Sequence, residues 1–342
     1  MTFWERDRHA DRAPLLAARG RIKKALRRWF ERQGFVEVEP ACLQVSPGNE
    51  THIHAFATEW RDEAGSTRPL YLHTSPEFAM KKLLAAGEPK IFAFSPSFRN
   101  REQASVLHAP EFTMLEWYEA GVGYEVTMDQ CGAILTNTAR ALGSARWTFR
   151  GRNMSARADV ERVKVADAFR AVRIDLLGTI SAMGSTNRDA LAAQAGGIGV
   201  RVGASDTWSD LFSRILVERI EPLLGKTRAT ILYEYPLPEA ALARACAHDP
   251  RLAERFELYG CGVELANGFG ELTDAVEQRK RFEIAMAEKQ HLYGERYPID
   301  EDFLAALEHM PPSSGCALGF DRLVMLATGA PRIEDVMWTP LA

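Results

Sequence analysis

Apolar residues recur at helical spacing over residues 15–33, and Gly34 follows them as a stop signal. This pattern predicts an amphipathic helix. Its polar face is basic, because residues 1–35 contain ten Lys and Arg against four Asp and Glu. Such a face is compatible with a solvated surface and with a docking surface for an acidic partner.

The rest of the chain alternates between short strand-like runs and longer helical ones, with residues 47–68 polar and irregular. Strands with hairpin-like spacing predict a mostly antiparallel sheet flanked by helices, an α+β fold, within a single domain over residues 1–342. Residues 143–225 are expected to form a helical insertion in it. Strands are expected at 35–40, 70–73, 91–94, 111–118, 230–235, 256–259, 262–266 and 315–319, and helices at 77–86, 124–142, 274–292, 301–309 and 322–327.

Composition narrows the class of protein. Hydrophobic residues make up 46% and charged residues 26% of the chain, which is typical of globular domains. No segment reaches the roughly 18 apolar residues of a membrane span, so we expect no membrane association. The formal net charge of −4 gives no support to nucleic-acid binding. Five scattered cysteines without a CxxC pair favour reduced thiols and a cytoplasmic location.

Three segments combine charged residues with apolar strands. The first contains Arg99, the second has glutamates at 257, 264 and 271, and the third is glycine-rich and ends in Arg322. Two arginines can clamp phosphates, and Glu257 and Glu264 can converge across a tight hairpin to hold Mg²⁺. The glycines permit close approach by a flat ligand such as adenine. Each acid alone is equally compatible with a surface salt bridge.

These segments resemble the three signature motifs of class II aminoacyl-tRNA synthetases. Glu39-Pro40 resembles motif 1, Phe98-Arg99-Asn100 opens motif 2, and the segment 319–322 closes motif 3. The runs PEFTMLEWY and ELANGFGELTD resemble the lysyl enzymes in particular. Lysyl-tRNA synthetases carry an anticodon-binding OB-fold ahead of motif 1, whereas about fifteen residues precede the first helix here. The chain is therefore more similar to elongation factor P lysine ligases, their free-standing paralogues, with no OB-fold expected.

The resemblance implies an adenylate-forming ligase that uses ATP and Mg²⁺. Arg99 and Arg322 are the implied catalytic residues, and Phe112 would stack on adenine with Arg322 on its other face. Glu257 and Glu264 would hold the metal. The implied ATP-binding residues are Arg99, Asn100, Arg101, Glu102, His108, Phe112, Glu264, Leu265, Gly319 and Arg322.

The resemblance also implies a pocket for lysine or β-lysine. Glu77 would take the α- or β-amino group, while Glu116, Tyr118 and Glu271 would surround the ε-ammonium. Ser75 and Ala317 stand where the synthetases usually have Ala and Gly, which favours the ligases. The implied substrate-binding residues are Ser75, Pro76, Glu77, Glu116, Tyr118, Asn267, Phe269, Glu271 and Ala317.

Motif 2 departs from the family pattern, because Arg101 precedes Glu102 where an acid is expected and the loop to His108 is one residue longer. An arginine near the adenine amino group would set donor against donor. We therefore expect Arg101 to turn toward the β- or γ-phosphate and Glu102 to take the adenine-reading place.

The implied activity is transfer of lysine or β-lysine to a lysine side chain of elongation factor P by a homodimer. Two alternatives remain: a truncated lysyl-tRNA synthetase, although tRNA is a less expected partner, and a non-catalytic regulatory protein. An asparagine synthetase is disfavoured, because Glu116 and Glu271 are acids where that enzyme needs cations.

Overall fold

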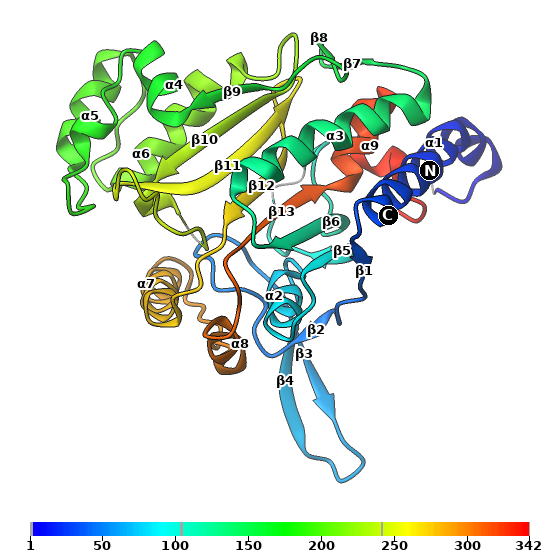
Figure 1. Ribbon diagram of the computed structural model, residues 1–342, viewed down its shortest axis with the longest axis horizontal. Coiled ribbons are helices and arrows are strands. Elements are labelled where there is room, and N and C mark those ends of the chain that lie inside the picture. Colours follow the sequence, from blue (N-terminus) through cyan, green and yellow to red (C-terminus); the bar gives the residue numbers. More distant parts are fainter. Residues whose placement is uncertain (1–2, 103–104, 241, 342) are drawn as a thin grey trace.

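The computed structural model describes residues 3–102, 105–240 and 242–341. Within them, a twisted eight-stranded sheet forms the centre of the molecule (Figure 1). Its two edge pairs, β1 with β5 and β9 with β10, are parallel, and all other neighbours are antiparallel, which confirms the predicted sheet. In spatial order the strands are β1 (Val36–Glu37), β5 (Lys90–Phe98), β6 (Glu111–Ala120), β13 (Ser313–Gly319), β12 (Val263–Gly270), β11 (Leu252–Gly260), β10 (Thr230–Pro236) and β9 (Glu161–Lys164).

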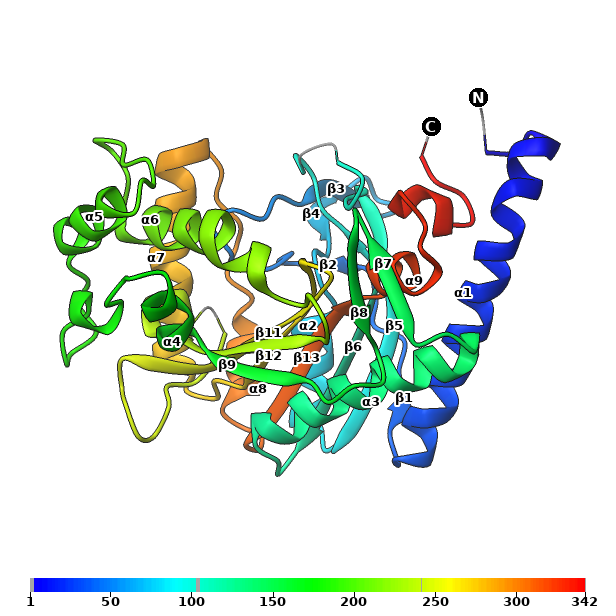
Figure 2. The ribbon, with the colours of Figure 1, turned by 90° about the horizontal axis from the view of Figure 1, so that it is seen from above.

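Helices cover both faces of this sheet (Figures 1 and 2). The strand alternation decides what each face packs, because Phe92 belongs to the core shared with α1, α3 and α9, while its neighbours Ile91 and Ala93 belong to the core shared with α2 and α8. None of the described helices is long and apolar enough to cross a membrane. The helices are α1 (Arg6–Arg32), α2 (Glu77–Ala85), α3 (Tyr124–Leu142), α4 (Val165–Ala171), α5 (Arg188–Gly197), α6 (Trp208–Ile215), α7 (Ala275–Tyr293), α8 (Glu301–Leu307) and α9 (Phe320–Thr328).

The prediction that residues 47–68 are irregular is wrong for residues 56–61 and 67–68, which lie in strands. Strands β2 (Leu43–Gln44), β3 (Phe56–Arg61) and β4 (Thr67–Leu72) form a second, three-stranded sheet, whose β3–β4 hairpin projects from the molecule (Figure 1). Strand β3 is exposed along most of its length, so it lacks the apolar alternation that marks a half-buried strand.

The insertion expected to be helical over 143–225 begins as β-structure. Strands β7 (Arg146–Phe149) and β8 (Arg152–Ser155) pair with each other, and β9 extends the main sheet. Helices α4, α5 and α6 follow, and their apolar residues pack with β10 in a separate cluster that includes Trp208 and Phe212. The insertion is therefore helical only from Val165 onward.

A buried ion pair ties α1 to the centre of the fold. Arg19 on α1 pairs with Asp321, and both side chains are nearly inaccessible to solvent. Asp321 also accepts the backbone N–H of Thr113 at 2.6 Å, while Arg19 donates to the Thr113 hydroxyl at 2.8 Å. The Arg19 guanidinium lies 4.8 Å from the centre of the Phe320 ring. One interaction thus connects the first helix with β6 and with the start of α9.

We expect Asp321→Asn to lower the free energy of unfolding by about 3 kcal/mol or more, because a buried cation loses its counter-charge. Urea denaturation measures this. The partly exposed pair Arg27–Glu37, with an N–O distance of 2.5 Å, is the matched control. Glu37→Gln should cost less than about 1 kcal/mol. Equal losses in the two variants would contradict the role of the Arg19–Asp321 pair.

Candidate active site

A cavity of about 370 Å³ lies against the central strands β6, β11, β12 and β13. It gathers residues from every one of the three sequence segments that carry the family resemblance. Of the residues predicted from the sequence, the cavity is lined by Ser75, Glu77, Arg99, Glu102, His108, Phe112, Glu257, Glu264, Leu265, Asn267, Phe269, Ala317, Gly319 and Arg322.

Strand alternation and one tight turn bring these side chains together. On β6, Phe112 and Met114 line the cavity, whereas Leu115 and Trp117 point into the core on the other face. Strands β11 and β12 are joined by a two-residue turn at Cys261 and Gly262, with φ angles of 51° and 72°. This hairpin places Glu257 and Glu264 on the same cavity, as the sequence predicted.

Glu116 lies fully buried beside the cavity rather than in its lining. It accepts hydrogen bonds from the Ser75 hydroxyl at 2.5 Å and the Tyr118 hydroxyl at 2.8 Å. Burial, and then the charge of Glu77, raise the pKa of Glu116 to about 8. Because Ser75 itself lines the cavity, its hydroxyl connects the cavity to this carboxylate.

Lys81 is a site residue that the sequence analysis missed. It is 1% exposed and forms ion pairs with both Glu77 and Glu271, two of the predicted substrate-binding acids. Burial alone would lower the pKa of Lys81, but Glu271 and Glu77 together raise it above its ordinary value. Burial raises the pKa of Glu271 to about 7, and Lys81 opposes that rise. The available signal was spacing, because Lys81 lies one helical turn after Glu77 on α2.

The arginines form a cationic cluster at another part of the cavity. The Arg99 guanidinium lies 5.3 Å from the centre of the Phe112 ring, and Arg99 approaches Glu102 at 3.8 Å. Arg322 lies 2.9 Å from His108 Nε2. Burial and then Arg322 lower the pKa of His108, which favours its neutral form.

Among the described residues that line the cavity, three have a buried polar atom without a hydrogen-bond partner: Arg99 at Nε, Arg255 at Nε and Asn267 at Oδ1. Buried polar groups are normally paired, so these atoms are available to a bound ligand.

The structure places Arg101 away from the cavity and so corrects the expectation that it faces the phosphates. Arg101 adopts a left-handed backbone with φ of 55°, and its side chain pairs with Glu295. Asn100 is also outside the cavity lining, where its backbone N–H donates to the His54 carbonyl at 2.7 Å. Glu102 does line the cavity. Residues 103 and 104 of this loop lie outside the described residues.

Three other predicted residues support the cavity without lining it. Pro76 is the N-cap of α2 and thereby sets where Glu77 begins the helix. Tyr118 and Glu271 are buried next to Gly315 and do not line the cavity. A Cβ atom on residue 315 would overlap the Tyr118 ring. Glycine at 315 is therefore a packing requirement of the site.

The two predicted metal ligands, Glu257 and Glu264, differ in the contacts that their carboxylates make with the rest of the chain. Glu257 accepts hydrogen bonds from Tyr235 at 2.6 Å, Tyr259 at 2.5 Å and Arg255 at 2.6 Å. Burial and then Glu257 raise the pKa of Glu264, which indicates two carboxylates that repel each other. No group of three or more candidate ligands gathers within the described ranges. Two carboxylates nevertheless fit Mg²⁺, which takes its remaining ligands from water and phosphate oxygens.

The chain belongs to the class II tRNA synthetases (D, K and N), whose family model matches residues 5–341. Within that class it is 37% identical to an elongation factor P–(R)-β-lysine ligase of Edwardsiella ictaluri, over 94% of this chain and 93% of the relative. It is 35% identical to the ligase of the same name from Hamiltonella defensa, over 95% and 94%. It is also 33% identical to a lysine–tRNA ligase of Pelotomaculum thermopropionicum, over 94% of this chain but 62% of that longer protein.

The raised pKa of Glu116 predicts a pH dependence of stability. The folded protein holds a proton on this carboxyl up to about pH 8, whereas the unfolded chain releases it near 4.5. The folded state therefore binds more protons between these values, and the free energy of unfolding falls as pH rises through them. Glu116→Gln removes the titrating group, so we expect a shallower fall between pH 5 and pH 8 than in the wild-type protein, measured by urea denaturation. Parallel curves for the two proteins would contradict this assignment.

Proposed function

We propose that this chain activates lysine or β-lysine with ATP as an aminoacyl-adenylate and transfers it to a lysine side chain of elongation factor P. The observation that supports it most strongly is a single cavity that joins two arginines to buried carboxylates. The first group suits a triphosphate and the second a diamino acid. The names of the relatives at 35–37% identity supply the protein acceptor.

In the first step, the substrate carboxylate attacks the α-phosphate of ATP in line, and pyrophosphate leaves. Arg99 and Arg322 neutralise the charge that develops on the phosphate oxygens. Phe112 offers an aromatic face for the adenine. When bound to Glu257 and Glu264, Mg²⁺ would supply further charge neutralisation at the phosphates.

The amino-acid end of the cavity holds the ammonium groups. Glu77 lies at its wall and would take the amino group near the reacting carboxylate. Glu116 and Glu271 lie deeper and would take the ε-ammonium. A buried ammonium needs such carboxylates to offset its desolvation.

In the second step, the neutral amine of the acceptor lysine attacks the carbonyl carbon of the adenylate. A new amide bond forms, AMP leaves with the bonding electrons, and the amine loses a proton. This chemistry needs no nucleophile from the chain itself.

The single most informative experiment is pyrophosphate exchange with a panel of amino acids, followed by mass spectrometry of elongation factor P. We expect exchange with lysine or β-lysine and a mass gain of one such residue on the acceptor. Charging of tRNA would favour the lysyl-tRNA synthetase alternative, and ligand binding without exchange would favour a regulatory protein.

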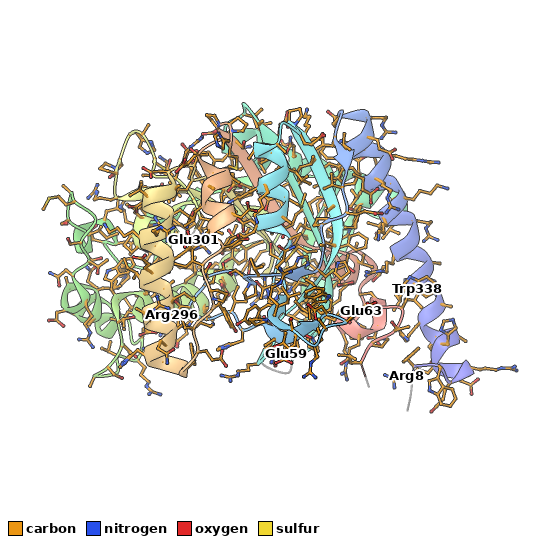
Figure 3. The ribbon with its side chains drawn as sticks, turned by 90° about the horizontal axis from the view of Figure 1, so that it is seen from below. Arg8, Glu59, Glu63, Arg296, Glu301 and Trp338 are labelled. Carbon is orange, nitrogen blue, oxygen red and sulfur yellow. The ribbon has the colours of Figure 1, made fainter. Side chains whose placement is uncertain are left out.

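The first prediction of this proposal concerns Glu271. Glu271→Gln should lose at least about 2 kcal/mol of transition-state stabilisation with lysine, because a buried ammonium loses a partner. The value of kcat/KM in pyrophosphate exchange measures it. Glu301→Gln is the control, since Glu301 forms an exposed pair with Arg279 on the surface of α8 (Figure 3). Unchanged kcat/KM in Glu271→Gln would overturn the assignment.

The second prediction concerns assembly. Strand β1 lies at the edge of the sheet, and Val36 on it is 53% exposed. An exposed edge strand that carries an apolar side chain is suited to a two-fold interface. We expect a homodimer that buries well over ~1,000 Å² in total. Light scattering at micromolar concentration should give twice the chain mass, and a monomer there would refute the proposal.

The proposal for the cellular location of the protein rests on the state of its cysteines. Each of the five is a free thiol in the described structure, four of them buried. Persisting thiols are typical of a reducing compartment, so we propose a cytoplasmic protein.

A further inference from the structure

The loop between β2 and β3, of which Glu50 and Ile53 line the cavity, is held by a buried lysine. Lys289 on α7 is inaccessible to solvent, and its ammonium donates to the carbonyls of Ile53 at 2.7 Å, Thr51 at 3.0 Å and Glu50 at 3.4 Å. An ammonium has three donors, and here each meets a carbonyl of the same loop. The backbone of this loop is therefore fixed from behind.

Other contacts fix the preceding residues. The Thr74 hydroxyl donates to the Pro47 carbonyl at 2.8 Å, and the Asn49 amide donates to the Pro298 carbonyl at 3.2 Å. Both Thr74 and Asn49 are buried. The loop thus has one defined conformation, and in it Glu50 lines the cavity.

Glu50 differs from the other acids of the cavity because no hydrogen bond or ion pair of its carboxylate is found among the described residues. Every other acid that lines the cavity has a donor from the chain. Those acids, each with one of its partners, are Glu77 with Lys81, Glu102 with Arg99, Glu257 with Tyr235, Glu264 with Arg322 and Asp321 with Arg19.

The surroundings of Glu50 indicate which part of the substrate it would meet. Burial raises its pKa, Arg99 opposes that rise, and Glu77 adds to it. Glu50 therefore shares the cavity with Arg99, which is assigned to the phosphates, and with Glu77, which is assigned to the amino group near the reacting carboxylate, and it is close enough for both charges to act on it. Since Glu77 already shares its charge with Lys81, the unpaired charge at this place belongs to Glu50.

We propose that Glu50 is a further substrate-binding residue, which receives the ammonium group of the diamino acid that lies nearest its reacting carboxylate. The inference rests on the proposed function and deepens it. Because the other acids that line the cavity are paired, this carboxylate is the acceptor left for a cationic group of the substrate, and the Lys289 contacts hold its loop in place. Charge-assisted hydrogen bonds of this kind are among the stronger ones in proteins.

The test compares two ligands that differ in the amino group at issue. Lysine has it, while 6-aminohexanoate lacks it and keeps the ε-ammonium and the carboxylate. Binding of both to wild-type protein and to Glu50→Gln is measured by calorimetry, and both are measured in pyrophosphate exchange, as substrate or inhibitor. Glu59→Gln is the matched control, because Glu59 is exposed on β3 (Figure 3) and is not among the residues that line the cavity.

We expect Glu50→Gln to weaken the binding of lysine by about ten-fold or more, while the affinity for 6-aminohexanoate changes by less than about two-fold. Glu50→Asp keeps the charge and should recover part of the loss. Equal losses for the two ligands, or wild-type affinity for lysine, would overturn the proposal.

The proposed function has a separate readout. Absence of exchange in the wild-type protein with every diamino acid would reject the function, while calorimetry with lysine would still decide the role of Glu50. Failure of the wild-type protein to bind lysine at all would overturn both.

Discussion

The amino-acid end of the cavity depends on one buried cation. Glu116 and Glu271 are buried beside Glu77, which lines the cavity, and like charges at such positions would repel each other strongly. Lys81 lies between Glu77 and Glu271 and makes their proximity possible. Lys81 lies one turn after Glu77 on the same helix, so α2 positions the first acid and its counter-charge together. The remaining acid, Glu116, keeps its proton more easily and relies on neutral hydroxyl donors.

The sheet performs the corresponding task for the phosphate end. Arg99 directly follows β5, and Arg322 lies in the first turn of α9, which directly follows β13. The antiparallel pairing of β5, β6 and β13 brings these two distant chain positions to one cavity. The Arg19–Asp321 pair fixes the residue directly before Arg322 to α1 and to β6. Stability and site geometry therefore share the same contacts, which is why a change at Asp321 would affect both.

Strand alternation and helix spacing were sufficient to predict the sheet, the helix 124–142 and the convergence of Glu257 with Glu264. They failed at β3, where polar residues on an exposed hairpin give no apolar period, and at β7 and β8, which are short. The prediction that Arg101 of the motif 2 loop faces the phosphates was wrong for a different reason. Arg101 finds Glu295, a residue almost two hundred positions later, and a pairing between loops distant in sequence leaves no local signal. Lys81 and Glu50 were missed because each resembles an ordinary surface charge until the fold encloses it.

The electrostatics of the site explain why a diamino acid suits it and an apolar amino acid of the same length does not. Norleucine has nearly the same side chain but would leave Glu116 without a cation, and a site built to pair with a polar group rejects the analogue that lacks it. The raised pKa values of about 8 for Glu116 and about 7 for Glu271 show that these two carboxylates are held in an environment that disfavours their charge. An arriving ε-ammonium reverses that preference, so its binding favours release of any proton that Glu116 holds. Selection for the second amino group is therefore a consequence of burial itself, and the small residues Ser75 and Ala317 then act on the shape of the space that remains.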